Sequence, residues 1–240
     1  MAESDYTYVA ERECPVCNKK IKVTMVRTRL IKTKQDSDFC TYYKDINPYY
    51  YSIWVCEHCG YAAQDTYFES INERDKKVIA EFLKSREVSI KIDLKRSREQ
   101  ALVAFKLAIY YADLLGMPAS KMGGLYLKLA WIYRADKMEM DEKKVLLRAL
   151  GYYEKALISE RFPIGNMTDT FLMYLIGALY QRIGNYDQSV SYLSKVVSSE
   201  RSKMEPNILK MARDLWQDIR ELRRLEAEGQ TTDETTDKII

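Results

Sequence analysis

Four of the five cysteines form two pairs that share one spacing. Cys14 and Cys17 are separated by two residues, and so are Cys56 and Cys59. Two intervening residues let the backbone make a tight turn that points both sulfurs at one ion, and two such turns complete the tetrahedron that Zn²⁺ prefers. Because four thiolates leave no open coordination position, a zinc ion held here would be structural. The pattern therefore predicts one structural Zn²⁺ on these four cysteines and indicates no reaction.

The residues around each pair favour tight turns over redox chemistry. Asn18 follows the first pair and Gly60 the second, at the position where such a turn favours a left-handed backbone. Redox activity would require a reactive pair at the N-terminus of a helix, and neither pair is set in that context. Cys40 is left over. We interpret it as a buried, inert side chain, with a substitute ligand or a redox sensor as the alternatives.

His58 is the only histidine, and it lies between two of the ligand cysteines, so its side chain is expected to point outward. Because no imidazole exists away from this cysteine turn, the sequence offers none for a separate Ser-His-Asp triad, and an HExxH motif would need two. Its glycines fit no phosphate-binding loop. Catalysis by carboxylates stays open, but the spacing singles out no pair of them. We therefore expect a protein that is not an enzyme.

Two β-prone segments lie between the cysteine pairs. Residues 21–34 are rich in β-branched side chains, residues 36–38 supply a turn, and residues 49–55 lead into the second pair. We expect segments 21–34 and 49–55 to pair as the antiparallel strands of a zinc ribbon. The 38 residues between the pairs exceed the roughly 15 to 20 of a common ribbon loop. An insertion is therefore predicted around the turn and the tyrosines that follow it.

A basic stretch without acidic residues lies between Cys14 and Gln35. It consists of Lys19, Lys20, Lys22, Arg27, Arg29, Lys32 and Lys34. These cations could bind phosphates while nearby tyrosines stack on bases, which would make a nucleic-acid surface. Alternatively, they offset the charge of about minus two that zinc with four thiolates carries. The second interpretation is favoured, since the first 70 residues hold 9 basic and 10 acidic side chains and the sequence pI is only 8.4.

Beyond Phe68, apolar residues recur at helical spacing to about Leu225. One pattern of a large residue between two smaller ones occurs three times, with starts 48 and 40 residues apart. The copies are Ala101, Phe105 and Ala108; Ala149, Tyr153 and Ala156; and Ser189, Leu193 and Val196. Small residues at this spacing let helices approach closely. We predict a tetratricopeptide-like array of helical hairpins, with a generic helical bundle as the alternative.

Such an array has a concave face, lined by the first helix of each hairpin, on which related scaffolds bind peptides. Matching of positions predicts five side chains on that face. They are Trp131, Arg134, Tyr174, Gln181 and Arg182. Each could equally be a packing residue, and core packing is the favoured interpretation for Trp131 and Tyr174.

A chain of 240 residues can hold a metal-bound module beside a separate core. We divide it into a zinc-ribbon module, 1–70, a helical-repeat region, 71–225, and a flexible tail, 226–240, and the predicted fold class is α+β. The net charge of +3 and the hydrophobic fraction of 47% are ordinary for a soluble protein. No apolar run approaches the roughly 20 residues of a membrane span, and no secretion signal is evident. We expect a cytoplasmic protein with reduced thiols and no membrane partner.

The order of these motifs resembles a family of uncharacterised bacterial proteins, the domain of unknown function numbered twenty-two twenty-five. The resemblance runs from about Glu13 to Leu222. It is carried by the two cysteine pairs, the basic strand, Asp36–Cys40, Tyr43, Asn47, Pro48, Tyr51, Gly60–Ala63 and the helices that follow. It implies zinc on the four paired cysteines, a bacterial cytoplasmic setting and no established activity. Asn18 stands where such turns commonly carry glycine, and asparagine tolerates the same backbone conformation.

Three hypotheses of function follow. The leading one is a non-enzymatic, zinc-binding scaffold or adaptor that holds a protein or peptide on its concave helical face. The alternative is a nucleic-acid-binding regulator that uses the basic strand. A third and weaker hypothesis is a thiol-based sensor in which loss of zinc exposes reactive cysteines.

Overall fold

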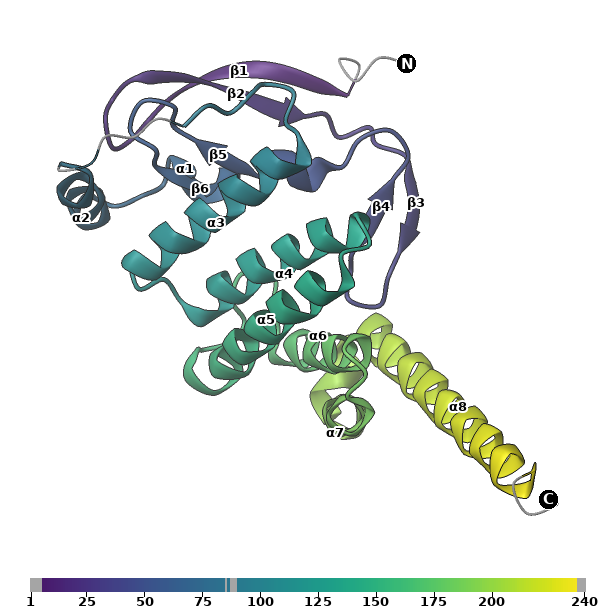
Figure 1. The fold of residues 1–240 in the computed structure, drawn as a ribbon. Coiled ribbons are helices and arrows are strands. Elements are labelled where there is room, and N and C mark those ends of the chain that lie inside the picture. The colour runs from purple at the N-terminus through teal and green to yellow at the C-terminus, as the bar shows by residue number, and fades with distance from the viewer. Residues whose placement is uncertain (1–5, 85, 87–89, 237–240) are drawn as a thin grey trace. The chain divides into compact units, whose positions relative to one another are not determined.

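A computed structural model describes residues 6–84, 86 and 90–236, with side chains described up to residue 225 (Figure 1). Its strands are β1 (Thr7–Glu13), β2 (Lys20–Val26), β3 (Lys32–Gln35), β4 (Thr41–Tyr43), β5 (Ile53–Val55) and β6 (Ala62–Gln64). Its α-helices are α1 (Asp65–Phe68), α2 (Glu73–Leu83), α3 (Arg98–Leu114), α4 (Ala119–Ala135), α5 (Glu139–Ser159), α6 (Asp169–Arg182), α7 (Tyr186–Ser198) and α8 (Pro206–Thr236), with 3₁₀ turns η2 (Pro48–Tyr51) and η3 (Glu200–Met204). The strands precede the α-helices, so the fold is α+β, as predicted.

The strands form three separate antiparallel hairpins, β1–β2, β3–β4 and β5–β6. The predicted pairing of segment 21–34 with segment 49–55 was wrong. The first segment is divided between β2 and β3, and the second contains η2 and β5. Each cysteine turn instead closes its own hairpin, in which β1 pairs with β2 and β5 with β6. Pairing across a short turn costs less loop-closure entropy than pairing across the long insertion.

Contacts between residues divide the chain into two compact units. The first contains the described residues up to Asp36 together with Cys40–Tyr152, and the second contains Ser37–Phe39 and the described chain from Tyr153 onward. This division differs from the predicted boundary at residue 70, because helices α3 and α4 belong to the same unit as the hairpins. The tip of the β3–β4 hairpin, Ser37–Phe39, belongs to the second unit.

The hydrophobic core of the first unit joins strands to helices. Helix α3 packs on β5 and β6 (Figure 1). The ring of Phe68 lies 4.9 Å from that of Tyr61 and 5.8 Å from that of Trp54, measured between centroids. Phe105 of α3 is completely buried in the same cluster. The hairpins that carry the cysteines therefore share one core with the helices.

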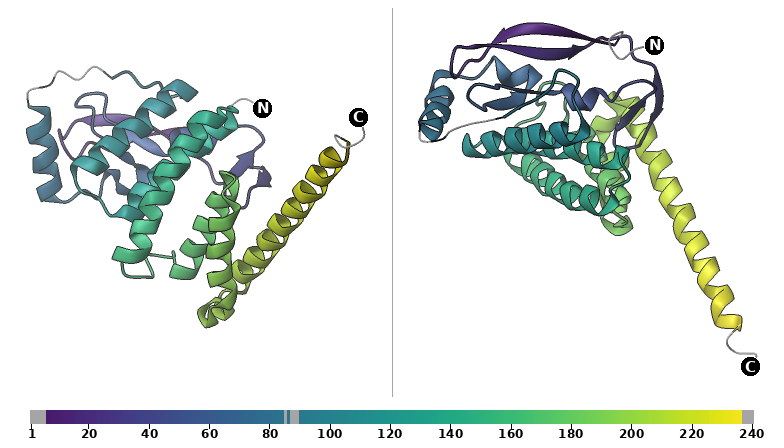
Figure 2. Two further views of the ribbon diagram at one scale, coloured as in Figure 1. Left: turned by 60° about the horizontal axis from the view of Figure 1, so that its bottom comes forward. Right: turned by 45° about the horizontal axis from the view of Figure 1, so that its top comes forward.

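In the second unit, α6 and α7 form a helical hairpin, and α8 packs against both (Figure 2). Gly184 follows the C-cap residue of α6 and has φ +82°. The Asn185 side chain accepts a hydrogen bond from the Gln188 amide at the start of α7. The Ser189 hydroxyl donates to the Gly177 carbonyl at 2.7 Å, so the two helices approach closely.

The nine residues of the repeated pattern are all buried, as expected of packing positions. This burial suits a stacked array and a generic bundle equally, so the tetratricopeptide-like class stays a prediction. Helix α8 continues to Thr236, through much of the predicted flexible tail. The remaining residues of that tail, 237–240, lie outside the described residues.

Candidate metal centre

The first cysteine pair lies in the turn between β1 and β2. The Cys14 amide donates a hydrogen bond to the Lys19 carbonyl at 2.9 Å, and the Asn18 amide donates to the Cys14 carbonyl at 2.8 Å. Asn18 has φ +56°, the left-handed conformation predicted for this position. The turn closes tightly around the two sulfurs of Cys14 and Cys17.

The second pair lies in the turn between β5 and β6 and repeats the same pattern. The Cys56 amide donates to the Tyr61 carbonyl, and the Gly60 amide donates to the Cys56 carbonyl, both at 2.8 Å. Gly60 has φ +78°, again as predicted. Two turns of one design thus carry the four cysteines.

The four sulfurs converge. Cys14 Sγ lies 3.6 Å from Cys59 Sγ, and Cys17 Sγ lies 3.6 Å from Cys56 Sγ. All four sulfurs lie within 4.8 Å of one another. A tetrahedral ion with metal–sulfur bonds of about 2.3 Å would separate its sulfur ligands by about 3.8 Å. The arrangement fits one metal ion held by four thiolates and is too wide for disulfide bonds of about 2.05 Å.

The thiols of Cys14, Cys56 and Cys59 differ in pKa. Hydrogen bonds from Cys14 and Cys59 lower the pKa of Cys56. The pKa of Cys14 is raised, mainly by its hydrogen bond to Cys56, and the pKa of Cys59 is raised, mainly by Cys14. One thiolate is favoured at the expense of its neighbours, because several negative charges at this spacing repel each other. A divalent cation removes this conflict, since it stabilises all four groups as thiolates.

His58 and Cys40, which the sequence analysis also considered for a chemical role, lie outside the sulfur cluster. His58 Nε2 is 3.2 Å from the Lys20 carbonyl oxygen on the exposed side of the turn. Cys40 is 1% exposed and borders a small cavity with Trp131. The predicted burial of Cys40 is confirmed, and its inertness stays a prediction.

The side chains of Arg96 and Thr24 form hydrogen bonds between the hairpin region and the segment that precedes α3. No motif in the sequence indicated these two residues. Arg96 Nη1 donates to the carbonyls of Ile53 (2.5 Å) and Tyr50 (3.1 Å). Burial lowers the pKa of Arg96 to about 10. Thr24 Oγ1 donates to the Leu94 carbonyl at 2.7 Å. Their partners are backbone carbonyls brought close only by tertiary folding, so a local pattern could not reveal them.

Two of the predicted partner-facing side chains are buried in the first unit. The Trp131 ring lies 5.0 Å from that of Tyr49. The Arg134 side chain is 4% exposed and forms ion pairs with Asp36 at 2.9 Å and Glu142 at 2.7 Å. The burial of Trp131 agrees with the favoured interpretation of that residue as core packing, whereas the burial of Arg134 corrects its placement on an open binding face. The insertion between the cysteine pairs covers them, since it supplies both Tyr49 and Asp36.

Tyr174, in the second unit, is covered in the same way. It is 1% exposed, its hydroxyl donates to the Ser37 carbonyl at 2.8 Å, and its ring lies 5.7 Å from that of Phe39. It is a packing residue and is not available to a partner. Of the five predicted contacts, Gln181 is half-buried and Arg182 is exposed.

The basic stretch is exposed but not uniformly positive. All seven basic side chains are accessible to solvent. In the β1–β2 hairpin, Lys22 lies opposite Glu11 and Lys20 lies opposite Glu13. The guanidinium of Arg27 lies 5.2 Å from the ring centroid of Tyr8. Acidic neighbours therefore offset part of the positive charge on this surface.

Residues 7–219 match a family described as uncharacterised proteins conserved in bacteria (DUF2225). The chain belongs to this family. The match includes both cysteine turns and the helices as far as the first half of α8, and the family description assigns no activity. No curated protein and no solved structure matches the chain. Among the described residues, no helix is both long enough and apolar enough to cross a membrane.

Proposed function

We propose that this DUF2225 protein is a non-enzymatic, zinc-binding scaffold or adaptor of the bacterial cytoplasm. The observation that carries the proposal is the convergence of four thiols, each pair in its own turn, within 4.8 Å. Four sulfur ligands close the coordination shell of a tetrahedral ion and leave no position for a substrate. The ion would therefore stabilise the fold and take no part in a reaction.

Zinc is the metal that this donor set suits best. Soft thiolate ligands select zinc, copper(I) and iron–sulfur clusters, and a single tetrahedral site of four thiolates is typical of structural zinc. Cys14 and Cys56 are completely buried, which limits access of solvent to the ion. Because the cysteine hairpins share a core with α3, the zinc would also hold that helix in place.

Elemental analysis of the purified full chain tests the metal assignment. We expect one zinc per chain, and replacement by cobalt should give the intense sulfur-to-metal charge-transfer absorption of a tetrathiolate site. Absence of stoichiometric metal, or spectra that show an exchangeable water ligand, would contradict the assignment.

The adaptor role rests on the helical hairpin of the second unit, which leaves Gln181 and Arg182 accessible at the end of α6. We propose that a protein or peptide binds there. Affinity capture from the native cytosol should recover a partner with the wild-type chain, and the double charge change Gln181→Glu with Arg182→Glu should abolish it. Lys210→Glu, at an exposed position of α8, is the matched control. Equal capture by all three proteins would refute this binding surface.

The alternative function is nucleic-acid binding by the basic stretch. It is supported by the exposure of Arg27 and Arg29. These two residues follow β2 and lie beyond the positions at which its lysines face glutamates of β1. Binding of a single-stranded oligonucleotide should then be strong at low salt, weaken as salt rises, and disappear in the double variant Arg27→Glu with Arg29→Glu. No binding by the wild-type chain at low salt would remove this alternative.

A further inference from the structure

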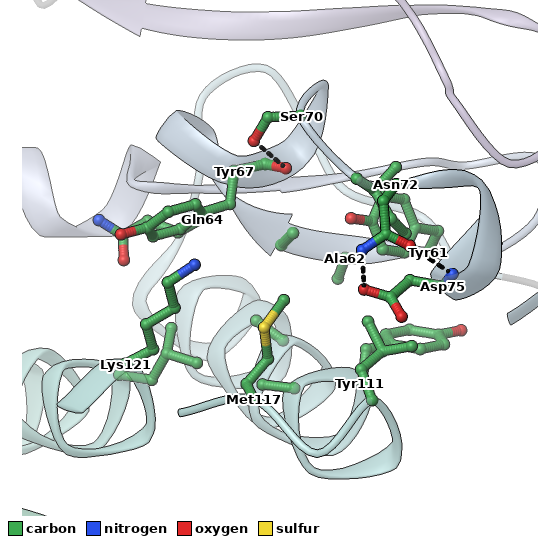
Figure 3. Close-up of a pocket in the computed structure, with 16 residues that line it drawn as sticks. Tyr61, Ala62, Gln64, Tyr67, Ser70, Asn72, Asp75, Tyr111, Met117 and Lys121 are labelled. Atoms are coloured by element: carbon green, nitrogen blue, oxygen red, sulfur yellow. Dashed lines mark hydrogen bonds between the residues drawn. The ribbon is translucent and has the colours of Figure 1, made fainter. Parts of the chain in front are cut away.

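The first unit contains a cavity of about 170 Å³ beside β6, the strand that follows the second cysteine turn. Its walls come from β6, α1, α3, α4 and the residues before and at the start of α2 (Figure 3). Aromatic, apolar and charged side chains share this lining. None of the metal ligands belongs to it. It is therefore a second candidate site, with a chemistry of its own.

Two opposite charges lie on different sides of this cavity. The ammonium group of Lys121 lies 4.0 Å from the ring centroid of Tyr67, and the Asp75 carboxylate accepts a hydrogen bond from Asn72 Nδ2 at 2.9 Å. In the part of the chain that the structure describes, neither charge has an ion-pair partner within 4.0 Å. Figure 3 shows Met117 between them. Both charges thus have capacity for a ligand of opposite sign.

Two largely buried tyrosines line the cavity with their aromatic rings. Tyr61 is 2% exposed and Tyr111 is 4% exposed, and their ring centroids are 5.7 Å apart. The faces of tyrosine rings attract cations. The two rings therefore favour a cationic ligand group on the same side of the cavity as Asp75 (Figure 3).

Apart from Gln64 and Ser70, the rest of the lining is apolar. It includes Ala62, Ala108, Ala112, Leu115 and Leu125. Such a surface favours a short hydrocarbon body and selects against a ligand that is polar along its whole length. The cavity therefore combines an apolar middle with one positive and one negative side.

We propose that this cavity binds a small zwitterion whose ammonium and carboxylate groups lie at opposite ends of a short apolar body, that is, an ω-amino acid or a dipeptide. The ammonium end lies toward Asp75 and the tyrosines, and the carboxylate end lies toward Lys121. A simple α-amino acid carries both charges on one carbon and cannot reach both sides. This inference does not rest on the scaffold proposal.

Calorimetric titration of the full, metal-loaded chain tests the proposal. The probes are 5-aminopentanoate and glycyl-leucine, with pentanoate and pentylamine as analogues that carry one charge. At least one zwitterion should bind ten or more times more tightly than either analogue, and the tighter of the two distinguishes an amino-acid source from a peptide source. Failure of both zwitterions to bind at millimolar concentration, or equal binding of all four probes, would overturn the proposal.

Substitutions assign the two ends separately. Asp75→Asn keeps a hydrogen-bond acceptor for Asn72 and removes the charge. It should weaken binding of the zwitterion and of pentylamine at least tenfold and leave binding of pentanoate unchanged. Lys121→Met should weaken binding of the zwitterion and of pentanoate and leave binding of pentylamine unchanged. Glu73→Gln and Lys106→Met remove the same charges from exposed positions of α2 and α3 and serve as matched controls. Wild-type zwitterion affinity in both cavity variants, with thermal unfolding showing that they are folded, would refute the assignment.

Discussion

The thiols of Cys14, Cys56 and Cys59 affect one another's proton affinity. Hydrogen bonds from Cys14 and Cys59 are the largest causes of the lowered pKa of Cys56. Loss of either sulfur should therefore raise the pKa of Cys56. It would also leave an incoming ion with an incomplete coordination shell.

Cys56→Ser should lower the zinc content of the purified chain well below one equivalent and destabilise the first unit. The reason is that metal binding worth on the order of 10 kcal/mol is coupled to folding in sites of this type. Elemental analysis and thermal unfolding measure the two effects. Cys40→Ala is the control, because Cys40 is a buried cysteine outside the sulfur cluster. Loss of zinc in the control as well would argue against the assigned ligand set.

Asp36 is the other residue whose charge is fixed by its neighbours. Burial alone would raise the pKa of its carboxyl, but hydrogen bonds from Lys34, Tyr42 and Arg134 outweigh burial and lower it. A group whose pKa is lower in the folded state stabilises the protein above its unfolded pKa of about 3.9. That stabilisation is lost as the pH falls through the lower, folded pKa.

Asp36→Asn should reduce the free energy of unfolding by about 1–2 kcal/mol at pH 7, because hydrogen bonds to a charged group are lost. The difference from the wild type should shrink as the pH falls below about 4 and then disappear. Urea unfolding at a series of pH values measures it. A difference that stays constant down to pH 2 would show that the carboxylate charge is not the stabilising feature.

At the scale of elements, the α6–α7 hairpin depends on one glycine. A Cβ atom added to Gly177 would lie 3.0 Å from two side-chain carbons of Leu193. Gly151, by contrast, lies in α5 with no atom within 4 Å of an added Cβ. Alanine substitution at both positions therefore distinguishes the intrinsic helix preference of alanine from the steric cost of close packing.

Gly177→Ala should destabilise the protein by about 1 kcal/mol, since overpacking costs about 1–3 kcal/mol and alanine recovers up to about 1 kcal/mol of helix propensity. Gly151→Ala should stabilise it by up to about 1 kcal/mol for the second reason alone. Chemical denaturation of both variants provides the comparison. Equal stabilisation by both would mean that α6 and α7 are packed less closely than described.

At the scale of the whole molecule, the boundary between units does not follow the boundary between strands and helices. The completely buried side chains of Ile21, Ile53 and Phe105 belong to one core cluster, although they come from β2, β5 and α3. Helices α6 and α7 contribute to a different cluster, around Leu193 and Ala212. Removal of the metal should therefore affect a helix of the first unit while sparing those of the second.

Hydrogen exchange before and after chelation of the metal tests this expectation. Exchange should accelerate in β1–β2, in β5–β6 and in α3, and should stay slow in α6 and α7. Under the division at residue 70 that the sequence predicted, α3 would instead keep its protection together with α6 and α7. Slow exchange of α3 after chelation would favour that division.

The sequence predicted the features that depend on near neighbours and missed those that depend on distant ones. The left-handed turns at Asn18 and Gly60 follow from two residues of spacing and the tolerance of asparagine and glycine for positive φ. Strand pairing was predicted wrongly, because β-branched side chains indicate a strand but not its partner. Arg134 was placed on an open face, because its helical position does not reveal the insertion that covers it.

The contact between Tyr174 and Ser37 joins residues that are 137 positions apart. During synthesis on the ribosome, the hairpin tip that carries Ser37 emerges long before helix α6 exists. At typical translation rates of about 5–20 residues per second, the tip waits on the order of 10 s for its partner. Phe39, which later stacks on Phe171, is exposed to solvent and to chaperones during that interval. The nascent chain must therefore tolerate an unpaired aromatic side chain until most of its length has been translated.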